Sequence, residues 1–220
     1  MVNSNRFFLV ILVLLFVMAG PTFTQSVGGG ISFFVPETLY FDGDGTVAFE
    51  QGLSTSIGFG SFLSIPIGFT YHASDGYRLE GTGLNSVVGP TLYGDIIAPY
   101  IQAKIRIPLG MLYIDGFAGG MAGYAFSLKP TGNFQKAFGA DFVLESYEFN
   151  RKFGYGWLAG GALGVRIGAI AVDLGVSYRD LGLPLEGTVT NRGLSAEQLP
   201  ADAIARLRGL AIRIGGNFSF

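Results

Sequence analysis

The chain of 220 residues contains no cysteine and a single histidine. Without cysteine there are no disulfides, no thiol catalysis and no thiolate metal ligands, and one histidine leaves little room for a multi-histidine metal centre. Charged residues make up only 14 % of the chain, and the formal net charge of −2 offers no basic surface for nucleic acid. We therefore expect no metal, no cofactor and no nucleic-acid partner.

Glycine and apolar residues, in contrast, are abundant. Glycine occurs 35 times, aromatic residues make up 14 % of the chain and hydrophobic residues 49 %. A chain this apolar is not disordered. After the first 26 residues, no uninterrupted apolar run reaches the length of about eighteen residues that indicates a transmembrane helix. The composition therefore indicates a membrane-associated chain that does not cross as a helix.

The first 26 residues have the pattern of a secretory signal peptide. Arg6 precedes an uncharged segment at 7–20, and Pro21 is followed by small residues at 22–26. The apolar segment is too short to span a bilayer comfortably but fits a signal-peptide core. We predict cleavage near residues 24–26 and a single exported domain at 27–220. The alternative is a helical anchor that is retained.

The remainder alternates with a period of two residues. Between 100 and 107 the apolar residues are Ile101, Ala103, Ile105 and Ile107, and they alternate with Tyr100, Gln102, Lys104 and Arg106. Because neighbouring side chains of a strand point to opposite faces, this segment has one apolar and one polar face. The same pattern predicts eight strands, at about 28–36, 53–60, 62–72, 98–107, 111–126, 155–168, 170–180 and 208–220.

Short and long connections alternate between these strands. This order predicts an all-β fold, an eight-stranded antiparallel up-and-down transmembrane β-barrel with short periplasmic turns and long extracellular loops. A soluble lipocalin-like barrel is the alternative, but it would need polar outer faces. Within the last long loop, residues 199–207 have the spacing of a short amphipathic helix.

The last strand carries the most specific similarity to a known group. Apolar residues alternate before an aromatic residue: Ile212, Ile214, Phe218 and Phe220. In this feature, and in its topology, the chain resembles the small eight-stranded outer-membrane barrels of the OmpW, OmpX and OmpA-barrel families. The resemblance implies a porin-like protein in outer-membrane lipid, and it implies that the last strand is the signal recognised by the barrel-assembly machinery.

Charged residues on the inward face predict a network inside the barrel. Its expected members are Lys104, Arg106, Asp115, Arg166, Asp173 and Arg213. The hairpin turns should place Lys104 near Asp115 and Arg166 diagonally across from Asp173. Such a network either fills and closes the barrel or forms a charged gate.

Nearer the extracellular side the inward positions become apolar. They include Phe34, Phe117, Met121, Leu158 and Ala162. Inward glycines, among them Gly123 and Gly164, lack the side chains that would fill this space, which favours a cavity. An apolar upper lumen over a charged floor resembles the OmpW family, whose barrels are associated with small hydrophobic compounds. The expected ligand is therefore a small hydrophobic molecule, and ordinary core packing is the alternative.

Two further functions remain open. The long loops could mediate adhesion or bind a surface partner. A lipid-modifying enzyme is the other candidate, because His72-Ala73-Ser74 resembles the His-x-Ser of outer-membrane lipid A deacylases. However, His72 lies on the inward face, whereas such an enzyme must face lipid. We therefore expect no enzymatic activity.

Overall fold

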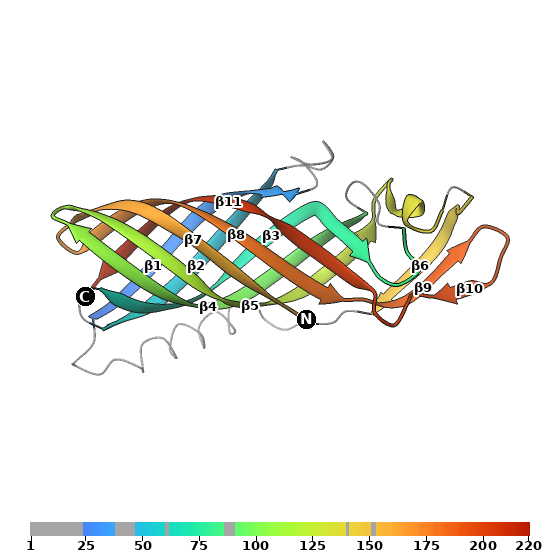
Figure 1. Ribbon diagram of the computed structural model, residues 1–220, viewed down its shortest axis with the longest axis horizontal. Helices are drawn as coiled ribbons and strands as arrows, with labels where there is room; N and C mark the ends of the chain where they lie inside the picture. The colour runs from blue at the N-terminus through green and yellow to red at the C-terminus, as the bar shows by residue number, and fades with distance from the viewer. Residues whose placement is uncertain (1–23, 38–46, 60–61, 86–90, 140, 151–152) are drawn as a thin grey trace, which may run out of the picture.

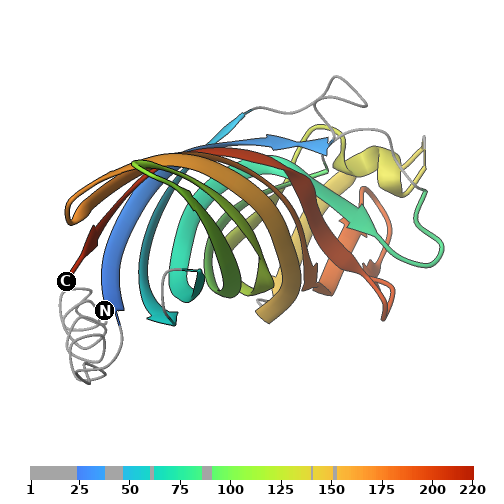
Figure 2. The ribbon, with the colours of Figure 1, turned by 60° about the vertical axis from the view of Figure 1, so that its left-hand side comes forward.

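A computed structural model describes residues 24–37, 47–59, 62–85, 91–139, 141–150 and 153–220. Eight long antiparallel strands close into a barrel in the order β1-β11-β8-β7-β5-β4-β3-β2 (Figures 1 and 2). These strands are β1 (Thr24–Pro36), β2 (Ala48–Phe59), β3 (Leu63–Glu80), β4 (Leu92–Leu109), β5 (Leu112–Pro130), β7 (Phe153–Ile167), β8 (Ile170–Pro184) and β11 (Ile204–Ser219). The predicted fold class is confirmed.

Most of the predicted signal peptide lies outside the described residues. Its last three positions, 24–26, are part of β1, where Thr24 pairs with Gly58 of β2 and Ser26 pairs with Ser219 of β11. Several strands also extend beyond their predicted extracellular ends. β3, for example, continues to Glu80 because the alternation of buried and partly exposed residues persists to that point.

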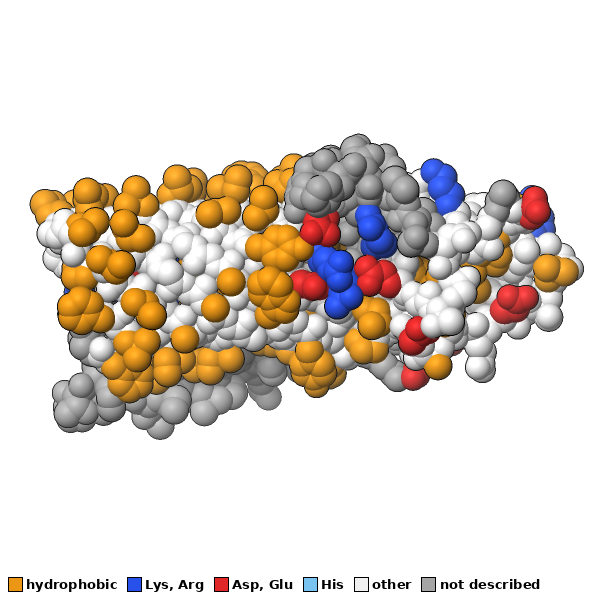
Figure 3. Space-filling view, viewed as in Figure 1, with side chains coloured by type: hydrophobic (Ala, Val, Ile, Leu, Met, Phe, Trp, Pro, Cys, Tyr) orange, Lys and Arg blue, Asp and Glu red, His pale blue; other side chains and the backbone are white. Residues whose placement is uncertain are grey.

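The outer surface of the barrel is apolar. On β8, for example, Val172, Leu174 and Val176 are exposed, whereas the intervening Asp173 and Gly175 are buried. Exposed hydrophobic side chains cover the barrel on the face seen in Figure 3, up to a group of charged residues near the extracellular end. A closed sheet with an apolar exterior satisfies its backbone hydrogen bonds internally and is suited to lipid. None of the helices among the described residues has the length and hydropathy to cross a membrane.

The barrel narrows toward its extracellular end. β1 ends at Pro36 and β2 begins only at Ala48, but β3 and β11 continue past them and pair directly with each other. The barrel therefore loses two strands from its circumference at this level.

An extension stands on the narrowed end. It consists of a three-stranded antiparallel sheet of β6 (Leu144–Asn150), β9 (Glu186–Asn191) and β10 (Ala196–Gln198), with the 3-10 helix η1 (Phe134–Ala137) beside it (Figure 1). The sequence predicted only long loops here. The predicted amphipathic helix at 199–207 is wrong, because β11 begins at Ile204 and pairs with Pro184 of β8. Ala203, Ala205 and Leu207 are buried and follow the period of two of a strand. The four-residue spacing between positions 203 and 207 fits a strand and a helix equally well, so it does not distinguish them.

Candidate functional site

A charged cluster fills the periplasmic half of the lumen. Arg106 of β4 and Asp115 of β5 are direct cross-strand partners. The Arg106 Nε and Nη2 atoms donate to the two carboxylate oxygens of Asp115 at 2.8 and 2.7 Å. Lys104 Nζ lies 3.4 Å from Asp115 Oδ2. The structure thus brings Lys104 and Asp115 together and makes Arg106 the bidentate partner, a geometry that favours arginine over lysine.

A second carboxylate extends this cluster across the lumen. Asp173 of β8 accepts hydrogen bonds from Arg213 Nη2 at 2.8 Å, from Asn217 Nδ2 at 3.1 Å and from the Tyr113 hydroxyl at 3.4 Å. The Arg106 guanidinium lies 3.7 Å above the centre of the Tyr113 ring and so links the two carboxylates. Two carboxylates thus pair with three basic side chains, so the lumen floor is ion-paired and keeps a formal excess of one positive charge.

Arg166 is not part of this cluster. It is exposed at the periplasmic end of β7, where its Nε donates to the carbonyl of Gly168 at 3.1 Å. The predicted diagonal pair of Arg166 and Asp173 is therefore wrong. The reason is the tight turn at Gly168, which has a φ of +60° and offers a nearby acceptor at the rim of the barrel.

A second charged layer lies deeper in the barrel, closer to the extracellular side. Glu50 of β2 is fully buried and accepts hydrogen bonds from Ser32 Oγ and from Arg179 Nη1, each at 2.7 Å. His72 Nδ1 lies 3.3 Å from Glu50 Oε1, and His72 Nε2 is 3.0 Å from the Tyr77 hydroxyl. We refer to Ser32, Glu50, His72, Tyr77 and Arg179 as the upper polar layer. It places a buried ion pair across the lumen.

The apolar pattern predicts a second strand that begins at residue 53 and leaves Glu50 in a loop, so this layer was not predicted. Every second residue of a strand faces the same side, so Ser54, Gly52 and Glu50 all face the lumen. This alternation could have predicted the position of Glu50. His72 faces inward as expected and bonds to Tyr77, while the Ser74 hydroxyl accepts a hydrogen bond from the Gly76 amide. A serine hydrolase would instead need the histidine beside the serine hydroxyl.

A small polar cavity lies between the two charged layers. Its lining combines Ser32 of the upper layer and Arg213 of the floor with Gly29, Gly30, Gly52, Ser54, Thr70, Tyr100 and Asn217. Hydroxyls, an amide and a guanidinium dominate this lining, so the cavity suits water or small polar species rather than an apolar molecule. Across the described ranges, no three His, Asp or Glu side chains are grouped closely enough to hold a metal ion.

The predicted apolar lumen residues are packed. Phe34, Met121 and Leu158 are at most 6 % exposed and belong to the same hydrophobic core, Phe117 packs against that core, and Ala162 is also buried. The core continues past them into the extension, where Phe134 and Val189 are buried in it. The structure therefore brings Phe34, Phe117, Met121 and Leu158 into a continuous apolar core and buries Ala162 outside it.

The inward glycines contribute to this packing. A side-chain carbon added at Gly164 would collide with the Tyr113 ring, and one added at Gly123 would collide with Leu181. Both glycines therefore accommodate a large neighbouring side chain. The expectation that they leave open volume is wrong, because side chains from neighbouring strands occupy the space beside each glycine.

The residues of the predicted assembly signal face lipid. Ile212, Ile214, Phe218 and Phe220 are all about half exposed on the outer surface of the barrel. This placement leaves their side chains accessible from the membrane side. Their recognition by an assembly machinery remains a prediction.

No known family profile matches the chain, and no curated protein sequence is significantly similar to it. Solved structures do match. A major outer membrane protein from Thermus thermophilus aligns with a TM-score of 0.55 at 10 % identity, covering 90 % of this chain and 100 % of the other. OprG from Pseudomonas aeruginosa aligns with a TM-score of 0.53 at 11 % identity, covering 90 % and 96 %.

At these identities the likeness concerns the fold. That fold is shared with outer-membrane proteins, and the apolar exterior supplies the physical reason for a membrane location. The chain therefore has the fold of outer-membrane β-barrel proteins and an exterior suited to lipid.

Proposed function

We propose that this protein is a closed, non-enzymatic outer-membrane barrel that acts through its extracellular extension. The observation that carries the proposal is the continuous apolar core that joins the upper lumen to the extension. Leu181, Leu183 and Leu207 in the upper barrel are at most 1 % exposed, and they share this core with Leu185 and Val189 of the extension. A molecule crossing the lumen would have to displace these side chains.

The energetics favour a closed lumen. Burying one leucine side chain contributes about 1.5–3 kcal/mol, so opening a path through several of them is costly. Below Leu181, Leu183 and Leu207 a solute would also meet the buried pair of Glu50 and Arg179. These two barriers in series support a structural or surface role over the passage of small hydrophobic molecules.

The extension offers a surface for a protein partner. In its sheet, β6 and β10 are the two edge strands, and an edge strand presents unpaired backbone groups that can pair with an extended segment of another protein. Exposed Glu145, Tyr147 and Glu148 lie along β6. The aromatic ring gives an anchor for binding, and the carboxylates favour a partner with basic residues.

A fluorescent apolar probe tests the lumen. The detergent-folded protein should show no saturable probe binding beyond that of the Leu158→Arg variant, and it should give no stepwise ion conductance in planar bilayers. The change in gel mobility on boiling serves as the folding control for both proteins. Saturable binding that only the wild type shows would overturn the proposal in favour of a hydrophobic conduit.

Binding to an array of immobilised extracellular proteins tests the extension. The Tyr147→Asp change on the edge strand should abolish the binding that wild type shows. Leu194→Asp is the matched control, because Leu194 is also an exposed apolar residue but lies in the turn between β9 and β10. Equal loss in both variants, or no binding by the wild type, would count against a partner at β6.

A further inference from the structure

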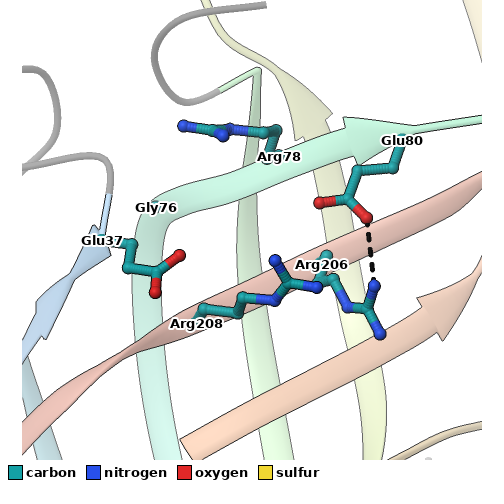
Figure 4. A pocket seen from close by; sticks show the side chains of 6 residues that line it. All are labelled: Glu37, Gly76, Arg78, Glu80, Arg206 and Arg208. Carbon is teal, nitrogen blue, oxygen red and sulfur yellow. Dashed lines mark hydrogen bonds and ion pairs between the residues drawn. The ribbon is translucent and has the colours of Figure 1, made fainter. Parts of the chain in front are cut away.

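A group of three arginines lies on the outer surface, at the extracellular end of the apolar exterior (Figures 3 and 4). On β11, Arg208 occupies the outward position next to exposed Leu210. On β8, Asp180 is likewise the next outward residue after Tyr178. Polar and charged side chains thus replace apolar ones on neighbouring strands at one level. This is the level of lipid headgroups.

Two of these arginines are placed directly opposite each other. Arg78 of β3 and Arg206 of β11 are cross-strand partners, and Arg208 is the next outward residue along β11. Three guanidinium groups therefore lie close together at one level of the outer surface.

Carboxylates hold the arginines without enclosing them. Arg206 Nη1 donates to Glu80 at 3.2 Å and Arg206 Nε donates to Asp180 at 3.0 Å, while Arg208 Nε donates to the other oxygen of Asp180 at 3.1 Å. The side chains of Arg206 and Arg208 remain about one third exposed. They are therefore oriented by the protein and still accessible to a ligand.

The arginines line a small, open surface pocket together with Glu37, Gly76 and Glu80. Figure 4 shows the side chains of Arg78, Arg206 and Arg208 around this space. At its edge the Tyr178 hydroxyl donates to Glu37 at 2.6 Å, and the Tyr178 ring lies 5.6 Å from the ring of Trp157. Tyrosine and tryptophan are typical of the boundary between lipid and water.

We propose that this pocket binds the phosphate group of a lipid headgroup in the outer leaflet. Guanidinium groups bind phosphate oxygens through paired, charge-assisted hydrogen bonds. The adjoining outer surface is apolar at Leu210 and Val176, so the acyl chains of the same lipid have a surface to lie against. This contact makes a lipid, rather than free phosphate, the ligand. The proposal is independent of the partner proposed for the extension.

The experiment uses the intrinsic fluorescence of Trp157, the single tryptophan of the chain. The full protein, folded in zwitterionic detergent, is titrated with bisphosphorylated lipid A and, separately, with dephosphorylated lipid A bearing the same acyl chains. We expect a saturable change with the phosphorylated lipid only. An equal response to both lipids would overturn the phosphate site, and displacement of the lipid by inorganic phosphate at similar concentration would overturn a lipid as the ligand.

Charge-matched variants identify the site. The double change Arg206→Gln with Arg208→Gln should weaken binding about tenfold or more, while Arg166→Gln at the opposite end of the barrel should leave binding unchanged. Unchanged binding in the double variant would refute the proposal.

Asp180→Asn separates ligand binding from folding, because it removes the ion pairs of both arginines with Asp180 but keeps the arginines themselves. This variant should bind the lipid as tightly as the wild type or more tightly. If it loses binding as the double variant does, the arginines serve the structure only. Gel mobility before and after boiling verifies that each variant is folded.

Discussion

The buried pair of Glu50 and Arg179 allows a quantitative test of the upper polar layer. We consider Glu50→Gln, which preserves the shape of the side chain and removes its charge. Glu50 is fully buried, and the Arg179 side chain is 8 % exposed and makes a 2.7 Å contact with the carboxylate. The substitution therefore leaves a guanidinium in the lumen without its buried counter-charge.

The expected cost follows from this burial. Removing one partner of a buried ion pair destabilises a protein by about 3–5 kcal/mol, because the remaining charge stays desolvated. The pair of Arg208 and Asp180 on the outer rim provides a contrast, because the Arg208 side chain is 35 % exposed. Exposed pairs contribute about 0.2–1 kcal/mol, so Arg208→Gln should have a much smaller effect on stability.

The assay is reversible urea unfolding of the protein in lipid vesicles, followed by tryptophan fluorescence. Glu50→Gln should lower the free energy of unfolding by several times as much as Arg208→Gln. The double variant Glu50→Gln with Arg179→Gln should regain most of the loss, because no unpaired charge is then buried.

A small loss of stability in Glu50→Gln, similar to that of the rim variant, would refute this reasoning. It would mean that water from the polar cavity solvates Arg179 and that the upper layer is not a dry barrier. The same result would weaken the proposed closure of the lumen.

Three further predictions concern other parts of the chain. Gly164→Ala should destabilise the barrel by about 1–3 kcal/mol because of the tyrosine ring against it, whereas Gly116→Ala, with open space around it, should be neutral in the same unfolding assay. Hydrogen bonds from the Thr82 hydroxyl and amide lower the pKa of Asp202 below its ordinary value of 3.8. These hydrogen bonds should therefore be intact at pH 3.8 and above, and they should be lost as the pH falls through the lowered pKa of Asp202. Hydrogen exchange of the Thr82 amide measures this loss, and the Asp202→Asn variant, which has no carboxylate to titrate, is the control. Phe220→Ala should reduce assembly in cells more than folding in detergent, compared by heat-modifiable gel mobility, and equal effects would contradict a role in recognition.

Much of the barrel could be predicted from local patterns. Side chains of a strand alternate between two faces, and lipid requires one of these faces to be apolar. The segment at 100–107 shows both properties without reference to any other strand. The contact of Lys104 with Asp115 also followed from the sequence, because a short hairpin turn fixes which residues of the two strands lie opposite.

The sequence did not predict features that depend on distant strands or on strand ends. Arg166 lies on the inward face of its strand but at the rim of the barrel. The alternation of faces therefore predicted its side correctly and did not predict its depth. Glu50 was missed because the second strand extends further than its apolar residues indicate. Its partner Arg179 is 129 positions away in sequence, and only closure of the barrel brings β2 and β8 to face the same space.

The sequence by itself therefore determined the eight barrel strands, apart from their extracellular ends, and their apolar and polar faces, because these depend on the period of the side chains and on the solvent. Only the tertiary structure shows how the upper lumen is packed. Glycines such as Gly123 suggested empty space in the sequence, but Leu181 of another strand occupies it. The tertiary structure also places Arg78 and Arg206 opposite each other on the outer surface. This happens because β1 and β2 do not reach the extracellular end of the barrel, so that β3 pairs with β11 there.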